Sequence, residues 1–330
     1  MLARAIAERR GGLRFYGLTP PKRGQEPAKV RAIAQRQVER IAGLAPDGLI
    51  LYDLQDETAR TGAERPFPFL PTLEPLDYAR EYLAELAVPR VIYKCVGNLG
   101  AAEFLRWIDA FAAPPGRDAL VLVGAPSSQA PAGGLGLREA HELLRSRGLA
   151  VCRGGVAIAE RHARRIDEDA RLLAKVRQGC GFFVSQTVYD AQATRSLLSD
   201  YALRFAAEGL APVPFIVSLA PCGSIKTMEF MKWLGVSFPR WLENDLRHSA
   251  DILETSVELA VKLFAELREY AGEKGIPLGV NVESVSIRRE EIEAACELFA
   301  RLSGGGVEVR EEVAGGRGGG GGAPPGRGGS

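Results

Sequence analysis

Histidine, cysteine and long apolar runs are scarce in this sequence, and each shortage argues against a class of protein. The three histidines are too few for a multi-histidine metal site and leave little material for a Ser-His-Asp triad. The five cysteines are odd in number and scattered, with no C-x-x-C pair and no His/Cys cluster at metal-ligand spacing. We therefore expect reduced thiols and no metal site.

An excess of charge of either sign is also missing. Lys and Arg number 42 against 41 Asp and Glu, a formal net charge of +1 that favours neither nucleic acid nor an anionic membrane as a partner. The N-terminal residues MLARAIAERRGG alternate charge where a signal peptide needs an unbroken apolar stretch, and no later segment approaches the length of a membrane span. We expect a cytoplasmic protein whose oligomeric state is open, a homo-oligomer included.

What the chain has in abundance is short apolar runs that alternate with helical patterns, which is typical of βαβ units and a parallel sheet. With 330 residues, of which 46% are hydrophobic, it can build one large core. Eight runs are rich in β-forming residues. They span residues 13–18, 48–54, 90–96, 119–125, 150–158, 181–189, 214–220 and 277–285.

Between these runs the spacing of apolar residues predicts helices, each with one charged face. The predicted helices span residues 27–43, 75–86, 101–112, 137–147, 166–178 and 191–208, with two further helical patterns within 225–272. Eight strand–helix repeats predict an α/β fold of the (β/α)8-barrel type over residues 1–303. An open doubly wound sheet is the alternative, weakened because no G-x-G-x-x-G follows the first strand. Residues 304–330 are Gly-rich and predict a disordered tail.

Polar residues gather where the predicted strands end. The active site of a (β/α)8 barrel is built by loops at the carboxyl ends of its strands, so these residues are candidates for chemistry. Asp53, Asp56 and Glu57 follow the second strand. In the eighth strand Asn281 and Glu283 lie two residues apart, so both can face the barrel mouth.

Several motifs taken together resemble methylenetetrahydrofolate reductase over nearly the whole barrel. The resemblance rests on PPK (20–22), GGVA (154–157), KVRQG (175–179), FFVSQTVYD (182–190), PFIVSLAP (214–221) and IKTMEFMKWLGVSFPRWL (225–242). It implies a barrel that binds tetrahydrofolate and takes a hydride from NADH or NADPH. Each motif alone is weak, and it is their order along the chain that carries the resemblance.

The resemblance also implies roles for individual residues. Gln186 matches the glutamine that hydrogen-bonds the folate pterin, Arg288 matches an arginine near the folate site, and Asn281 joins them as a substrate contact. The implied cofactor contacts are Lys22, Glu160, His162, Lys175 and Ile225.

At three places the sequence departs from the pattern. The carboxylic acid expected three residues before PPK, the proton donor to the folate, is Gly17. The Arg-Gly-Asp expected to contact the flavin is Val123, Gly124 and Ala125, and the acidic residue ahead of Lys175 is at best Glu168. FAD is therefore a doubtful cofactor. Since Gly17 cannot donate, we expect one of the remaining acids to do so: Asp53, Asp56, Glu57 or Glu283.

Three functions follow from these observations. The first is a flavin-independent reductase that converts methylenetetrahydrofolate to 5-methyltetrahydrofolate by direct hydride transfer from NAD(P)H. The alternative is a folate-binding or methyl-transfer-associated barrel that has lost reductase chemistry, which the missing acid and flavin residues equally allow. The third is a non-catalytic barrel that acts within an assembly.

Overall fold

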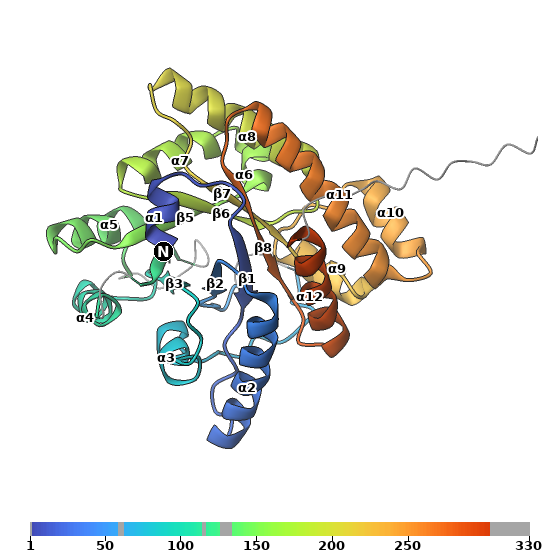
Figure 1. Cartoon of the computed structure of the whole chain (residues 1–330), viewed down its shortest axis with the longest axis horizontal. Coiled ribbons are helices and arrows are strands. Elements are labelled where there is room, and N and C mark those ends of the chain that lie inside the picture. The colour runs from blue at the N-terminus through green and yellow to red at the C-terminus, as the bar shows by residue number, and fades with distance from the viewer. Residues whose placement is uncertain (1, 59–62, 114–116, 126–133, 304–330) are drawn as a thin grey trace, which may run out of the picture.

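The chain folds as a closed barrel of eight parallel strands surrounded by helices. The computed structural model describes residues 2–58, 63–113, 117–125 and 134–303. Strands pair in chain order and the barrel closes between the first and the eighth (Figure 1). The strands are β1 (Arg14–Leu18), β2 (Gly48–Leu51), β3 (Arg90–Cys95), β4 (Ala119–Val123), β5 (Cys152–Ala157), β6 (Phe182–Thr187), β7 (Phe215–Leu219) and β8 (Leu278–Glu283). The predicted (β/α)8 barrel is confirmed, and the open sheet is excluded.

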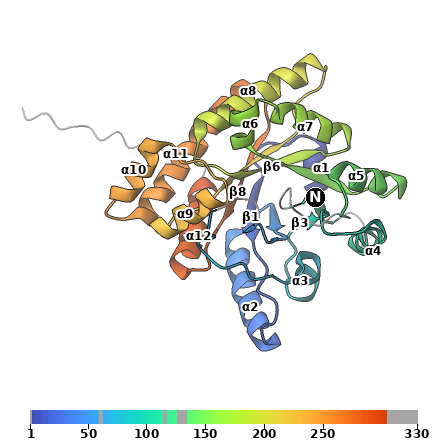
Figure 2. The same ribbon diagram turned by 180° about the vertical axis from the view of Figure 1, so that it is seen from behind.

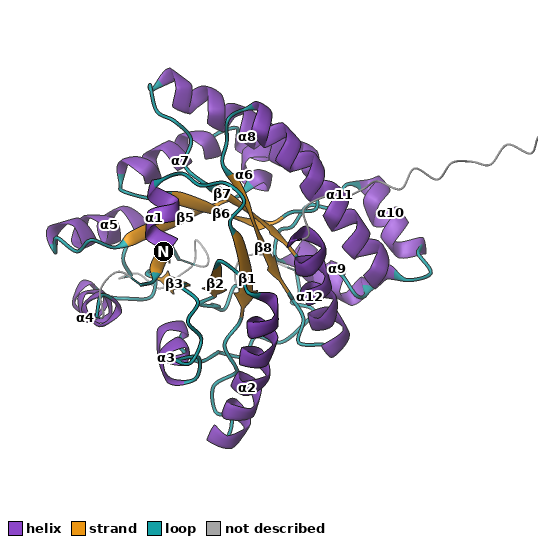
Figure 3. Ribbon diagram, in the orientation of Figure 1, coloured by secondary structure: helices purple, strands orange, loops and turns teal. Residues whose placement is uncertain are grey.

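Helices form the outer layer around this central sheet, as Figure 3 shows by its colours. The helices are α1 (Leu2–Ala7), α2 (Pro27–Leu44), α3 (Pro75–Glu81), α4 (Ala101–Phe111), α5 (Leu137–Ser146), α6 (Ala159–Arg165), α7 (Glu168–Arg177), α8 (Ala191–Ala207), α9 (Ile225–Trp233), α10 (Arg240–His248), α11 (Ile252–Glu273) and α12 (Arg289–Ser303). Apolar residues of most helices pack against the outer side of the strands, because burial there removes their apolar area from water, whereas those of α10 pack with α9 and α11.

The seventh connection differs from the sequence prediction. Two helical patterns were predicted within 225–272, and the structure has three helices there, α9, α10 and α11. Gly235, with φ at 94°, follows α9 and turns the chain in a conformation that other residues rarely adopt. Asp251 begins α11 by accepting hydrogen bonds from the backbone N–H groups of Leu253 and Glu254.

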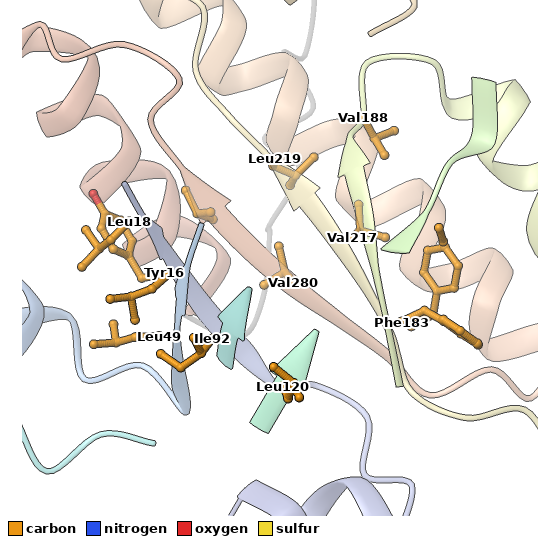
Figure 4. Close-up of a cluster of buried hydrophobic side chains, with 14 of the residues drawn as sticks. Tyr16, Leu18, Leu49, Ile92, Leu120, Phe183, Val188, Val217, Leu219 and Val280 are labelled. Atoms are coloured by element: carbon orange, nitrogen blue, oxygen red, sulfur yellow. The ribbon is translucent and has the colours of Figure 1, made fainter. Parts of the chain in front are cut away.

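Side chains fill both sides of the barrel wall. Outward-facing residues such as Ile92, Leu120 and Val217 pack under the helices, and Figure 4 shows them among other members of this larger cluster. The inward-facing residues form a second cluster inside the barrel. A Cβ on Gly154 would lie 2.4 Å from the Phe182 ring, so this glycine makes room for a large aromatic in the barrel interior.

The N-terminal helix α1 closes one end of the barrel. Its residues Leu2, Ala5 and Ile6 are buried and belong to the interior cluster. The α1 helix lies over the barrel end in Figure 1, and Figure 2 views the molecule from behind. Because the N-terminal ends of the strands are covered, the loops at the carboxyl ends are the place to look for a site.

Two sequence expectations remain to be placed. Residues 304–330, predicted to form a disordered tail, lie outside the described residues. Within the described part of the chain, no helix combines the length and the apolar character needed to cross a bilayer.

Candidate functional site at the carboxyl end of the barrel

The interior of the barrel becomes polar towards the carboxyl ends of its strands. Asn281, on β8, is fully buried and donates from Nδ2 to the Tyr52 hydroxyl at 2.9 Å and to Ser218 Oγ at 3.2 Å. Its Oδ1 is also buried and has no hydrogen-bond partner in the described structure. The alternation predicted for the eighth strand is thus confirmed for Asn281, and it leaves one buried acceptor unsatisfied.

Glu283 lies one step further along β8, towards the mouth. Its Oε1 accepts a hydrogen bond from Thr187 Oγ1 at 2.8 Å, and its carboxyl also hydrogen-bonds the Tyr52 hydroxyl. Burial raises the pKa of Glu283 above the usual value for a carboxyl, and the hydrogen bonds from Tyr52 and Thr187 oppose this rise. The side chain can therefore hold its proton above the pH range usual for a glutamate.

The neighbouring strand makes room for this carboxyl. Gly17 pairs with Glu283 in the register of β1 and β8. A Cβ at Gly17 would lie 2.9 Å from Glu283 Cβ, 3.0 Å from Tyr52 Cε2 and 3.1 Å from Glu283 Oε2. The space that a side chain on β1 would need is already filled by an acid from β8 and an aromatic ring from β2.

Strand β6 brings two further polar side chains to the mouth. The pairing of β6 with β7 shifts register between Val184 and Thr187, so strict alternation fails there. Thr187 reaches Glu283, and Gln186 donates from Nε2 to the Leu234 carbonyl at 2.8 Å. This bond fixes the Gln186 amide at the barrel mouth, where it is half-buried.

Asp53 also lies at this end of the barrel, where its carboxylate hydrogen-bonds the backbone. Its Oδ2 accepts from the Cys95 N–H at 2.8 Å, and its Oδ1 accepts from Gln55 Nε2 at 2.8 Å. Burial raises the pKa of Asp53, although these hydrogen bonds and Lys94 lower it. Asp53 joins the ends of β2 and β3, and it remains a candidate acid.

The other two acids of this loop are placed differently. Asp56 is exposed and accepts hydrogen bonds from the backbone N–H and hydroxyl of Thr58, which lower the pKa of its carboxyl. A carboxyl that readily ionises is a poor proton donor near neutral pH, so these hydrogen bonds make Asp56 a weak candidate for the proton donor. Glu57 is half-buried in the same loop.

A second pair of carboxyls faces the turn between α9 and α10. Glu160 accepts from the Ser237 N–H at 3.3 Å, and Asp190 accepts from Ser237 Oγ at 3.4 Å. Burial raises the pKa of Glu160, and the nearby Asp190 carboxylate raises it further. Asp190 also caps α8 through the Ala193 N–H. Glu160 belongs to α6, which directly follows β5, and it stays a predicted cofactor contact.

His162 and Lys175, expected as cofactor contacts, lie in the helical layer instead. His162 is 2% exposed, and its Nε2 lies 3.0 Å from Asp200 Oδ2 on α8. Lys175 donates to the Val156 carbonyl, and its side chain packs on Gly155. Burial lowers the pKa of Lys175. Both side chains are used in joining helices to the barrel wall.

The remaining expected contacts follow the carboxyl ends of strands β1, β7 and β8. Lys22 is half-buried, and its backbone bridges to Thr72. Ile225 begins α9 and is 37% exposed. Arg288 directly precedes α12, where its exposed side chain lies 3.8 Å from Glu290. The structure brings Gln186, Asn281 and Glu283 to the barrel end. Lys22, Ile225 and Arg288 lie further out.

The positions where flavin contacts were expected carry no such groups. The Val123 side chain packs against the cluster inside the barrel, and Ala125 is an exposed residue without polar side-chain atoms. Glu168 is fully buried, and it accepts hydrogen bonds from the Ile158 N–H and from Arg161. In the described structure, none of these three residues therefore presents a free charged or hydrogen-bonding side-chain group to a flavin at the mouth.

Sequence reasoning missed three members of this polar network, Tyr52, Thr187 and Ser218. Tyr52 follows β2 in the same alternation as Ile50, a signal that was available in the sequence. Ser218 is similarly two residues beyond the interior Ile216. Thr187 points inward only because of the irregularity in β6, which alternation cannot predict.

The described residues contain no group of three or more His, Cys, Asp and Glu side chains suited to hold a metal ion. All five cysteines are free thiols, and Cys95, Cys180 and Cys222 among them are buried. The polar side chains described above at the carboxyl end of the barrel carry carboxyl, amide, hydroxyl and phenol groups.

Comparison with known proteins gives one informative match. No protein-family model matches the chain, and no curated protein matches it. Among solved structures, an uncharacterized protein from Clostridium thermocellum that binds two copies of 5-methyl-5,6,7,8-tetrahydrofolic acid is 43% identical, with a TM-score of 0.77. The match covers 90% of this chain and 97% of that one.

Two further solved structures are far less similar to this chain. A 2,3-dimethylmalate lyase of the PEP mutase/isocitrate lyase superfamily is 14% identical with a TM-score of 0.43, over 90% of this chain and 93% of its own. A dihydropteroate synthase from Xanthomonas albilineans is 13% identical with a TM-score of 0.42, over 91% and 96%. Similarity this slight carries no argument about function.

Proposed function

Because the chain belongs to the same family as the Clostridium thermocellum protein, we propose that it binds a reduced folate of the 5-methyltetrahydrofolate type. The observation that carries this proposal is 43% identity over 97% of a protein whose structure holds that ligand. The match covers 90% of this chain, so it is not confined to one motif.

The polar end of the barrel suits such a ligand. A reduced pterin is a planar ring system with ring N–H and amino donors on one edge and a carbonyl acceptor on another. Gln186 donates one amide hydrogen to the Leu234 carbonyl, and no described residue donates a hydrogen bond to its amide oxygen. That oxygen can accept a pterin N–H, while a protonated Glu283 can donate to the carbonyl side. Both partners lie at the carboxyl end, as barrel sites require.

Calorimetric titration of the purified protein with 5-methyltetrahydrofolate tests this proposal. We expect saturable binding, and p-aminobenzoylglutamate, which lacks the pterin, should bind far more weakly. Arg138→Ala is a matched control, since this side chain is exposed on α5 and pairs with the exposed Glu142. It should bind like the wild type. Absence of saturable binding at millimolar ligand would refute the proposal.

We further propose that the site also takes methylenetetrahydrofolate as a substrate, and that the protein reduces it to 5-methyltetrahydrofolate, the product, as a divergent relative of methylenetetrahydrofolate reductase. The observation that favours chemistry over binding alone is an acid at the mouth, Glu283, whose pKa is raised by burial. NADH or NADPH would supply the hydride to the methylene carbon, and an acid would supply the proton when the five-membered ring opens.

The residues present fit a nicotinamide cofactor only in part. Lys22 lies in the loop after β1, Glu160 in the first turn of α6 and Ile225 at the start of α9. All three follow the carboxyl ends of strands, where they can contact the cofactor. His162 and Lys175 are engaged in the helical layer and are not available. Val123 and Ala125 give a flavin no charged or hydrogen-bonding side chain. These observations favour direct use of NAD(P)H over a flavin relay.

Incubation with NADH or NADPH and methylenetetrahydrofolate, followed by chromatography of the folates, separates the alternatives. Formation of 5-methyltetrahydrofolate without added flavin supports the reductase. Binding without turnover leaves a folate-binding or methyl-transfer-associated protein. Neither binding nor turnover leaves a non-catalytic barrel that acts within an assembly.

A further inference from the structure

The carboxyl group of Glu283 is held by three elements other than its own strand. Thr187 on β6 donates to Oε1, Tyr52 after β2 hydrogen-bonds the carboxyl, and Gly17 on β1 leaves the space in which Oε2 lies. A glutamate side chain on the surface samples many rotamers, whereas this one is fixed from three sides. Such fixing is typical of a group that must meet a ligand in one orientation.

The Tyr52 hydroxyl is fixed in turn. It accepts from Asn281 Nδ2 at 2.9 Å, which leaves its proton for the Glu283 carboxyl. The Tyr52 ring packs edge-on against Tyr93, with ring centroids 4.9 Å apart. The order Ser218, Asn281, Tyr52, Glu283 therefore forms a continuous polar chain that ends at the carboxyl.

The titratable groups that face Glu283 in the described structure are phenols. Tyr52 and Tyr93 both interact with it electrostatically, and burial raises the pKa of each phenol well above its usual value. Both phenols therefore remain neutral across the working range of pH. Thr187 and Asn281, the other groups against the carboxyl, do not titrate. None of these neighbouring groups changes its charge, so the group that titrates at this contact is Glu283 itself.

We propose that Glu283, in its protonated form, donates a hydrogen bond to the acceptor edge of the bound reduced pterin, where the ring carbonyl and the lone pair of the methyl-bearing nitrogen lie side by side. Tyr52 is the positioning residue that orients the carboxyl. This inference rests on the proposed function, since it names how the same site recognises its ligand. No covalent step is involved, and the proton stays shared between carboxyl and pterin.

An ionised Glu283 would instead face two acceptors with a negative charge. The hydrogen bond would be lost and the carboxylate would be desolvated by the ligand. Affinity for 5-methyltetrahydrofolate should then fall as the pH rises through the pKa of Glu283. At pH values above that pKa, the affinity should decrease by about tenfold for each pH unit, since binding requires the proton.

The test is the dissociation constant of 5-methyltetrahydrofolate measured by calorimetry across a series of pH values. The wild type should show the fall described above. Glu283→Gln keeps a donor that does not titrate, so its affinity should lose this pH dependence. Any titration of the ligand itself appears in both proteins and cancels in the comparison.

Thr187→Val and Tyr52→Phe provide an independent readout that needs no change at Glu283. Each removes a hydroxyl that lowers the pKa of the carboxyl, so the midpoint of the affinity loss should move to higher pH. A purely structural role for either hydroxyl would weaken binding without moving the midpoint.

Two outcomes overturn the inference while leaving the proposed function intact. One is a wild-type affinity that does not change with pH, and the other is an identical pH dependence in wild type and Glu283→Gln. If the wild type does not bind 5-methyltetrahydrofolate at any pH, the proposed function itself fails. Near-ultraviolet circular dichroism shows whether each variant keeps the native fold.

Discussion

Replacing Gly17 by alanine probes the contact on which the polar barrel end depends. The new Cβ would lie 2.9 Å from Glu283 Cβ and 3.0 Å from Tyr52 Cε2. Carbon atoms normally approach to about 3.5–4.0 Å, so each contact is too short by roughly half an ångström or more. Glu283 Cβ is bonded to the strand backbone, and the Tyr52 ring is packed on Tyr93, so neither can simply rotate away.

Overpacking of this kind costs about 1–3 kcal/mol of unfolding free energy. The lower backbone entropy of alanine in the unfolded chain returns roughly 0.5–1 kcal/mol, which leaves a net loss of about 1 kcal/mol from the middle of the two ranges and of at most about 2.5 kcal/mol. Each kcal/mol corresponds to a decrease in Tm of about 2–4 °C for a chain of this general size. Displacement of Glu283 and Tyr52 should also weaken 5-methyltetrahydrofolate binding.

Thermal and urea unfolding, followed by circular dichroism, measure the loss. Gly43→Ala is the matched control, because a Cβ at this position in α2 would meet no atom within 4 Å. It should be neutral or stabilising by up to about 1 kcal/mol. In a Glu283→Ala background, Gly17→Ala should cost less, since the clash with the carboxyl is gone. A Gly17→Ala protein as stable as the wild type, with unchanged ligand affinity, would refute the geometry described for this site.

Three further predictions follow from other parts of the molecule. Gln186→Ala should weaken 5-methyltetrahydrofolate binding roughly tenfold or more, since a buried hydrogen bond is worth about 1–3 kcal/mol when its partner is left unsatisfied; calorimetry that finds unchanged affinity removes Gln186 from the site. The purified protein should be colourless and its absorbance spectrum free of flavin, because Val123 and Ala125 cannot form charge-assisted bonds; a yellow preparation with stoichiometric FAD contradicts this. Burial lowers the pKa of His141 from 6.5 to about 4, so the folded protein resists its protonation and stability should fall as the pH decreases from about 6.5 towards 4. Over that pH range, the unfolding free energy of His141→Leu should decrease by about 3 kcal/mol less than that of the wild type, as measured by urea unfolding. An equal decrease in both proteins would show that other groups dominate the pH dependence.

The sequence was sufficient to predict the barrel because its signals are local and repeated. All eight apolar runs became strands, and most predicted helices agree with those observed to within a few residues. Helix α6 was missed because residues 159–165 are short and polar, and it ends at Ile166 in a left-handed conformation that no residue type signals. Two helical patterns rather than three were predicted for the seventh connection, where α9 and α10 are each only nine residues long and follow one another closely in the sequence.

The candidate site could be predicted only where strand alternation holds. Asn281 and Glu283 face inward as alternation requires, whereas Thr187 depends on the irregularity of β6. Spacing also gave no sign that His162 would be buried against Asp200 in the helical layer, because helix-to-helix contacts are set by packing across the chain. The filling of the space at Gly17 by Glu283 is a tertiary contact between residues 266 positions apart in the sequence.

A crystal structure of the protein grown with 5-methyltetrahydrofolate tests the central claim most directly. The account predicts a pterin at the carboxyl end of the barrel, with Gln186 and the Glu283 carboxyl both within hydrogen-bond distance of its ring. A pterin bound elsewhere on the molecule, or a barrel mouth that stays empty of folate while the ligand is present at saturating concentration, would contradict it.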